Sequence, residues 1–390
     1  MKVIATGDWH ACNFTDFSKK YQVYFDNNTG RYTEVSDEEA PLYNTIEMNS
    51  RLHNILNGLC DMRDYADENS IEHILMAGDM FHKRGTIDVS VFNAVYRILS
   101  TFEPLGIKLH AIAGNHDQID NSKVPVSAIH TLSDVIHVVE TPEVFTIESN
   151  NESYQVLAVP YSKDKEYVLD SIKSLRKHLD NKGESILMCH LGITGGKVGS
   201  GMYSMNGEYT LSELLCSKWK YLIAGHYHQP QILAENAIYP GTPVQNSFSD
   251  EMPSDNDGGY NGFFVLDMSK RYDIHFVPII APRFVTVSSV KDLENLDSQF
   301  LQENHIRVKS DAKNVDDIKE VLTNILGEEQ PEIRLELEKD YSVEQRSDID
   351  VSKSFDETVE IYAKERYTGN VQEAIKVGLD ILSEAMVGGV

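Results

Sequence analysis

The chain has 390 residues, 41% of them hydrophobic, and its 61 Asp and Glu outnumber its 35 Lys and Arg, giving a formal net charge of −26. That length predicts two or three domains with a sizeable core. The negative charge excludes a protein that holds nucleic acid through a broadly basic surface. No apolar run is long enough for a bilayer, and the first residues do not resemble a signal peptide. We therefore expect a cytoplasmic globular protein with no membrane partner.

Two minor features give little indication of function. The four cysteines, which are far apart and form no CxxC pair, predict buried free thiols rather than a disulfide framework or a zinc knuckle. The basic segment 163–182 is a candidate for local nucleic-acid contact, although a solvated helix face explains its charges at least as well. The cysteines are Cys12, Cys60, Cys189 and Cys216.

Apolar runs and helical periodicity alternate along the first 117 residues. This β-α-β-α-β order is typical of a parallel, doubly wound sheet. Residues 18–45 interrupt it with a predicted surface hairpin over 21–35, whose role the sequence does not indicate. We predict strands at 3–6, 71–77 and 107–113, and helices at 43–69 and 89–102.

Residues 135–278 predict further strands, which complete a two-sheet α/β domain. A glycine-rich stretch, 192–201, lacks the spacing of a phosphate-binding loop and is expected to be a mobile loop over a site. The last four strands of this region are expected to form a second, mostly antiparallel sheet. The strands are predicted at 135–139, 144–147, 154–160, 185–190, 219–226, 231–233, 237–239, 262–267 and 272–278, with a helix at 165–180.

After residue 281 the pattern restarts as a small β-α-β-α-β module, followed by an acidic link, 340–352, and two amphipathic helices. An apolar stripe on the second helix either packs on the chain's own core or inserts into a partner's groove, and the sequence favours neither. We predict domains at 1–280, 281–340 and 341–390. The elements are strands 284–287, 305–309 and 332–338, helices 291–296, 315–326, 355–367 and 371–386, and the stripe Val371, Ile375, Gly378 or Leu379, Leu382 and Met386.

Polar side chains follow five of the predicted strands. Ligands of open α/β sheets bind at the carboxyl ends of strands, so these side chains are expected to meet. Two Asp, one Asn and four His suit two borderline divalent ions such as Mn, Fe or Zn. The residues are Asp8 and His10, Asp79, Asn115 with His116 and Asp117, His190, and His226 with His228.

Three of these residues have chemistry that suggests a particular role. Asp79 is the natural bridging ligand of two ions held about 3.5 to 4 Å apart. His116 is able to hold or deliver a proton, and Asp117 is able to fix the tautomer that His116 presents. An ordinary β-turn is the alternative explanation of Gly114–Asp117 taken alone.

The order of the motifs resembles the binuclear metallophosphoesterases. These motifs are Gly7-Asp-Trp-His10, Gly78-Asp-Met-Phe-His82, Gly114-Asn-His-Asp117, the isolated His190 and Gly225-His-Tyr-His228. The second one is similar to that of SbcD-type DNA repair nucleases. The resemblance implies a two-sheet metallophosphoesterase sandwich flanked by helices, a small α/β capping domain that contacts DNA, and C-terminal helices that bind an ATPase.

The resemblance also implies roles for single residues. One metal, most simply Mn²⁺, would be held by Asp8, His10, Asp79 and His228, and a second by Asp79, Asn115, His190 and His226. His116, oriented by Asp117, would protonate the departing sugar oxygen, and His82 would lie beside the scissile phosphate. One departure from the family is Ala11-Cys12 after the first motif, which leaves the role of Cys12 open.

Three functions follow from these observations. The first is a manganese-dependent nuclease, an exonuclease on double-stranded and an endonuclease on single-stranded DNA, that works with an SbcC-type ATPase and forms a homodimer through helices near 45–65 and 85–102. The second is a phosphoesterase acting on nucleotides or other small esters. The third, a non-catalytic scaffold, requires missing ligands, and every expected ligand is present.

Overall fold

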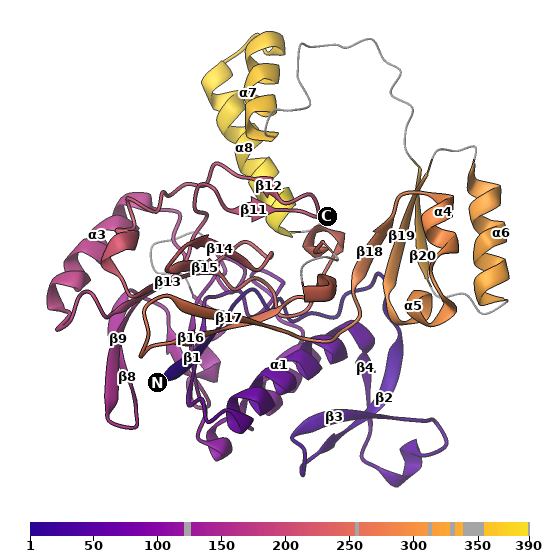
Figure 1. The fold of residues 1–390 in the computed structure, drawn as a ribbon, viewed down its shortest axis with the longest axis horizontal. Helices are drawn as coiled ribbons and strands as arrows, with labels where there is room; N and C mark the ends of the chain where they lie inside the picture. The colour runs from indigo at the N-terminus through magenta and orange to yellow at the C-terminus, as the bar shows by residue number, and fades with distance from the viewer. Residues whose placement is uncertain (121–125, 254–256, 311–313, 328–331, 338–354, 389–390) are drawn as a thin grey trace. The chain divides into compact units, whose positions relative to one another are not determined.

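The computed structural model describes residues 1–120, 126–253, 257–310, 314–327, 332–337 and 355–388 (Figure 1). The chain divides into two compact units. Unit 1 contains residues 1–197, 206–244 and 260–281, and unit 2 contains 198–205, 245–259 and 282–390. No helix in the described part of the chain is both long and apolar enough to cross a bilayer.

The first sheet of unit 1 has six strands in the order β17-β16-β1-β5-β6-β7. Strands β1, β5 and β6 are parallel, as predicted, and β7 adds a fourth parallel strand beside β6. The prediction that β16 and β17 belong to the second sheet was wrong, because β16 pairs antiparallel with the edge of β1 and β17 extends from it. The bounds are β1 Lys2–Thr6, β5 His73–Met76, β6 Lys108–Ile112, β7 His137–Val139, β16 Gly262–Asp267 and β17 Asp273–Pro278.

The second sheet has the order β14-β15-β13-β10-β9-β8, with β9, β10, β13 and β15 parallel. Apolar side chains from facing strands of the two sheets, such as Leu75 and Met188, form one buried cluster between them. This arrangement confirms the two-sheet sandwich. The bounds are β8 Glu143–Ser149, β9 Glu152–Val159, β10 Ile186–His190, β13 Tyr221–Gly225, β14 Gln231–Ala234 and β15 Ala237–Tyr239. Short strands β11 Lys197–Val198 and β12 Tyr203–Ser204 lie in and after the glycine-rich stretch.

Three helices flank the sandwich: α1 Ser50–Glu68, α2 Val89–Leu99 and α3 Lys165–Leu175. Residues of α1 and α2, Leu56 and Val95 among them, form a second buried cluster with β1, β5 and β6. The predicted start of the first helix at residue 43 was wrong. Residues Ile46–Asn49 form strand β4, and Asn49 caps α1 by accepting hydrogen bonds from two backbone N–H groups of its first turn.

The predicted hairpin is confirmed as β2 Lys20–Asp26 and β3 Arg31–Val35, to which β4 adds a third strand. This small sheet lies beside α1 (Figure 1) and is fastened to it. The guanidinium of Arg63 donates to the carbonyl oxygens of Gly30 and Thr29 at 2.9 and 2.8 Å, and His53 Nε2 lies 2.8 Å from the carbonyl oxygen of Tyr32. The insertion therefore covers the face of α1 that points away from the sandwich.

Unit 2 contains a parallel three-stranded sheet, β18 Phe284–Val287, β19 His305–Ser310 and β20 Ile333–Leu337, with helices α4 Val290–Glu294, α5 Ser298–Glu303 and α6 Val315–Leu326. Apolar residues of these elements form a third core. The predicted strands and helices are confirmed, but α5, a second helix between β18 and β19, was not predicted.

Two helices, α7 Phe355–Arg366 and α8 Val371–Gly388, follow as predicted. The acidic link 340–352 lies outside the described residues. Ile375 of the predicted stripe is buried, and a Cβ built on Gly378 would lie 2.7 Å from Val359 of α7. At Gly378 the stripe therefore faces α7, while Val377 and Ile381 remain exposed on α8.

Candidate metal centre

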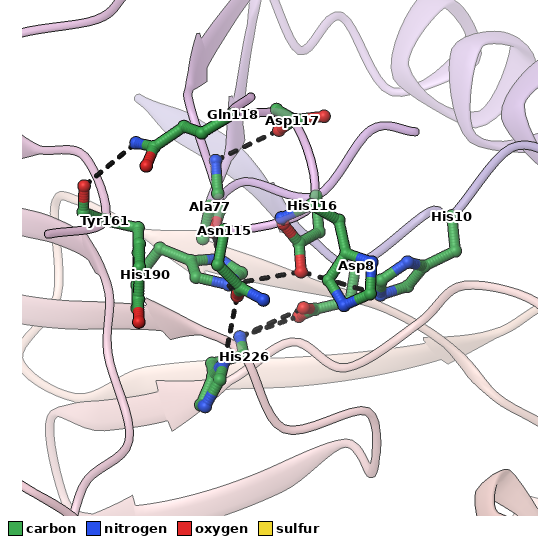
Figure 2. Close-up of polar contacts among 12 residues, drawn as sticks. Asp8, His10, Ala77, Asn115, His116, Asp117, Gln118, Tyr161, His190 and His226 are labelled. Atoms are coloured by element: carbon green, nitrogen blue, oxygen red, sulfur yellow. Dashed lines mark hydrogen bonds and ion pairs between the residues drawn. The ribbon is translucent and has the colours of Figure 1, made fainter. Parts of the chain in front are cut away.

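The predicted ligands follow the carboxyl ends of β1, β5, β6, β10 and β13, and the fold brings them together (Figure 2). Four of them, Asp8, His10, Asp79 and His190, are completely inaccessible to solvent, and His228 is 7% exposed. Buried ionisable groups at such density are expected only where they are paired or bind cations.

One group of donors surrounds Asn115. The Oδ1 atom of Asn115 lies 2.9 Å from Nε2 of His190 and 3.2 Å from Nδ1 of His226 (Figure 2). The Nε2 atom of His190 also lies 3.3 Å from Oδ2 of Asp79. These four residues are the set that the family resemblance assigned to the second metal.

A second group surrounds His10. Donor atoms of Asp8, His10 and His228 all lie within 4.8 Å of one another, and His10 Nε2 is 3.6 Å from Oδ2 of Asp79. One carboxylate oxygen of Asp79 thus faces both groups, which is the position of a bridging ligand. Among the described atoms, His10 Nε2 and Asp79 Oδ2 are buried without a hydrogen-bond partner. Such atoms fit a site for divalent cations.

The backbone of the centre is strained. The φ angles of Asp8, His10, Asp79 and His226 are +51°, +49°, +56° and +109°. Residues other than glycine rarely adopt positive φ angles. Such residues cost on the order of 1–3 kcal/mol each and persist where the surroundings hold them. Here His10 N donates to the carbonyl oxygen of Asp79 at 3.0 Å, and His226 N donates to both carboxylate oxygens of Asp8.

The protonation of the centre without metal follows from burial and mutual attraction. Burial raises the pKa of Asp8 to about 6, against the attraction of His190. Burial opposes the charge of His190, but the neighbouring Asp79 carboxylate raises its pKa to about 9. Burial and His190 lower the pKa of His226 to about 3. A neutral His226 is the form that binds a metal.

The structure corrects the predicted role of Asp117. Its carboxylate accepts hydrogen bonds from the backbone N–H groups of Phe81 and Gly114, each at 3.0 Å. The Nδ1 atom of His116 lies 2.6 Å from the carbonyl oxygen of His82. A carbonyl only accepts, so Nδ1 carries hydrogen and the carbonyl of His82, not Asp117, fixes the tautomer. Asp117 instead ties the second motif to the third.

His82 also lies at the centre. Its ring is stacked on that of His116, with centroids 5.6 Å apart, and its Nδ1 is 3.4 Å from Nδ1 of His10. Nitrogen atoms of His10, His82 and His116 lie within 4.8 Å of one another. The family resemblance predicted that His82 lies beside the scissile phosphate, and this stays a prediction.

Cys12 contributes no atom to the donor groups found in the described residues. It is 5% exposed, and burial raises the pKa of its thiol. The other cysteines are also buried and free, as predicted. In the basic segment, Lys165 pairs with Glu213 and Arg176 lies over the ring of Trp219, which favours the helix-face interpretation for these two charges.

Sequence reasoning missed Tyr161, whose ring lies beside His190 and His226. The available signal was its position, because Tyr161 comes two residues after β9, another strand that ends at this edge of the second sheet. The glycine-rich stretch was only partly understood. Ile193 is buried, and its backbone N–H group donates a hydrogen bond to the hydroxyl oxygen of Tyr239. The first part of the stretch is therefore fixed rather than mobile.

A buried group of carboxylate, amide and imidazole donors at the strand ends of a two-sheet α/β sandwich defines a metal-dependent phosphoesterase. Residues 1–230 match the family model described as calcineurin-like phosphoesterase, and the chain belongs to this family. The family uses a pair of divalent metal ions, and the donor groups described above are suited to hold them.

Individual relatives are distant. The chain is 22% identical over 190 residues to phosphoesterase 078R of Invertebrate iridescent virus 3, covering 47% of this chain and 50% of that one. It is 24% identical over 213 residues to exonuclease subunit 1 of Enterobacteria phage T4, covering 54% and 58%. The matches therefore span little more than half the length of these relatives. Among solved structures, GAP50, the anchor in the inner membrane complex of Plasmodium, matches with a TM-score of 0.37 and 11% identity, covering 72% of this chain and 89% of that one.

Proposed function

We propose that the protein is a cytoplasmic, manganese-dependent DNA nuclease, with exonuclease activity on double strands and endonuclease activity on single strands. The observation that carries the proposal is the position of His82, which the Gly78–His82 motif places against His116 and His10. The similarity to a phage exonuclease subunit supports it. Two bound divalent ions would lower the pKa of water and neutralise charge on a phosphodiester.

The chain's own residues supply the remaining chemistry. With hydrogen on Nδ1 held by the His82 carbonyl, Nε2 is the atom from which a charged His116 delivers a proton to the leaving oxygen. His82 provides a second imidazole on the same side, placed to contact a phosphate oxygen. The backbone N–H group of His116 donates to Oδ1 of Asp79 at 2.7 Å. This hydrogen bond fixes the position of the proton donor relative to the proposed metal ligands.

We further propose two protein partners. An SbcC-type ATPase would contact the exposed apolar residues Val377 and Ile381 of α8. A homodimer would use α2, where Val89 is 73% exposed, rather than α1, which the β2-β3-β4 sheet covers. Loss of ATPase co-purification in a Val377→Asp, Ile381→Asp variant would support the first contact. A monomeric Val89→Arg variant in sedimentation would support the second.

The experiment that tests the activity uses labelled linear duplex DNA, labelled single-stranded circles and Mn²⁺ with the purified chain, beside Asp79→Ala and His116→Ala variants. Degradation that both variants lose supports the proposal. If the DNA stays intact even with an SbcC-type ATPase and ATP, and p-nitrophenyl phosphate or nucleotide monoesters are hydrolysed, the enzyme is instead a phosphoesterase of small esters.

A further inference from the structure

The ring of Tyr161 lies against two of the predicted ligands. Its centroid is 6.2 Å from that of His190, with the rings nearly perpendicular at 81°, and 6.4 Å from that of His226, with the rings nearly parallel at 25°. Figure 2 shows His190 between Tyr161 and Asn115. Tyr161 therefore contacts both histidines, His190 and His226, whose ring nitrogens lie near the Oδ1 atom of Asn115.

The backbone of Tyr161 is fastened on both sides. Its N–H group donates to the carbonyl oxygen of Ala113 at 2.9 Å, and its carbonyl oxygen accepts from Nε2 of Gln118 at 2.9 Å (Figure 2). Gln118 is completely buried. Ala113 and Gln118 directly flank the Gly114–Asp117 loop. Their hydrogen bonds therefore fix the position of Tyr161 relative to the loop that carries Asn115.

The plane of the His226 imidazole is defined by a second tyrosine as well. The ring of Tyr227 is 5.4 Å from that of His226 at 32°, and Tyr227 is 2% exposed. One ring nearly parallel to His226 and a second one tilted by 32° restrict its rotation about the Cβ–Cγ bond. Fixing the orientation of a ligating imidazole raises its affinity for a metal, because less rotational freedom is lost on binding.

The other donor group has different neighbours. Around His10, the ring centroids of His82, His116 and His228 lie 5.3, 4.7 and 4.6 Å from its own. A change at Tyr161 should consequently act on one metal and spare the other.

We infer that Tyr161 is a positioning residue for the Asn115, His190 and His226 donor group, and that its ring, on a backbone held by Gln118, sets the affinity of this group for its metal. The inference rests on the proposed metal centre. It assigns the role to the ring and not to the hydroxyl group, since the contacts with both imidazoles are made by the ring.

The test is calorimetric titration of the metal-free full chain with MnCl₂, together with metal analysis after dialysis. We expect two equivalents for the native chain. Tyr161→Ala should lower the affinity for one Mn²⁺ equivalent about 10- to 100-fold and leave the affinity for the other unchanged. Tyr161→Phe should bind both as the native chain does. Tyr43→Ala is the matched control, because Tyr43 is 44% exposed and stacks on Tyr24 in the small sheet.

If circular dichroism shows that Tyr161→Ala is unfolded, Tyr161→Leu and Gln118→Ala replace it, with the same selective weakening expected. The inference is overturned if these variants bind both equivalents with native affinity, or if both equivalents weaken equally. It is also overturned if Tyr161→Phe loses as much affinity as Tyr161→Ala. If the native chain binds fewer than two Mn²⁺ ions, the proposed metal centre itself is wrong. The native stoichiometry therefore distinguishes a failure of the metal centre from a failure of the role of Tyr161.

Discussion

The carbonyl oxygen of His82 lies 2.6 Å from Nδ1 of His116, so a residue of the second motif decides which nitrogen of the third motif's histidine is free. This hydrogen bond connects the ends of β5 and β6, which are neighbours in the first sheet. A main-chain oxygen makes the contact, and it is retained when the side chain of His82 is changed. The two histidines therefore have separable roles.

Replacing His116 with Ala should lower kcat for phosphodiester cleavage by about 10²- to 10⁴-fold, because a positioned proton donor contributes about that much. The metals should stay, since the side chain of His116 belongs to neither predicted set of ligands. Cleavage rate and metal content are to be measured on the same preparation. His275→Ala, at a 67% exposed side chain, is the control. Loss of both metals from His116→Ala would make His116 a ligand and contradict its role as donor.

Replacing Asp117 with Asn should destabilise the protein. The native carboxylate accepts hydrogen bonds from the backbone N–H groups of Phe81 and Gly114, and the NH₂ of Asn would face one of these N–H groups without being able to accept from it. A buried N–H left without a partner costs about 1–3 kcal/mol of unfolding free energy, measurable by urea denaturation. The pH dependence of kcat should stay that of the native chain. A fully stable Asp117→Asn variant with an altered pH profile would restore the role predicted from the sequence.

The sequence was most informative where the chemistry and the strand ends coincide. The meeting of Asp79 and His190 was predictable because an apolar strand leads to each one and parallel strands end at the same edge. The role of Asp117 was not predictable, because which neighbour accepts the His116 proton depends on backbone geometry between two loops. Residues adjacent along the chain, His116 and Asp117, point to different partners.

Errors in the fold have a similar cause. Strands β16 and β17 lie 256 or more residues after β1 along the chain, and alternation of apolar residues does not say which sheet edge is free. The segment Ile46–Asn49 precedes a helix and reads as its first turn, but its pairing with β2 makes it a strand. Both errors concern pairing, which local patterns do not encode.

Replacing Gly114 with Ala should remove metal binding and activity together. A Cβ at this position would lie 2.1 Å from Oδ1 and 2.4 Å from the backbone nitrogen of Asp79, so the bridging carboxylate has to move. Gly183→Ala is a matched control for glycine substitution, because a Cβ there meets only the side chain of Asn181, at 3.9 Å. Native Mn²⁺ stoichiometry in Gly114→Ala would show that Asp79 tolerates displacement.

A chain of three histidines crosses β5, β6 and β7 away from the metal centre. His73 Nδ1 lies 3.0 Å from His110 Nε2, and His110 Nδ1 lies 3.0 Å from His137 Nδ1. His73 Nε2 faces the carbonyl oxygen of Glu148 at 3.0 Å and must donate to it. A neutral His73 then accepts from His110, which in turn accepts from His137, so both nitrogens of His110 are engaged while its ring is neutral.

This arrangement predicts how stability depends on pH. Burial, with the neighbouring His73 and His137, lowers the pKa of His110 to about 3, while the unfolded chain has the ordinary value near 6.5. Between these values the unfolded state binds the extra proton, so the unfolding free energy falls as pH drops below about 6.5, with a slope of up to about 1.4 kcal/mol per pH unit from this residue. His110→Phe, which keeps the stacking on Phe145, should be less stable at pH 7.5 but have a shallower slope between pH 6.5 and 5 in urea titrations. An unchanged slope would mean that other groups, such as carboxylates, His73 and His226, cause the acid sensitivity.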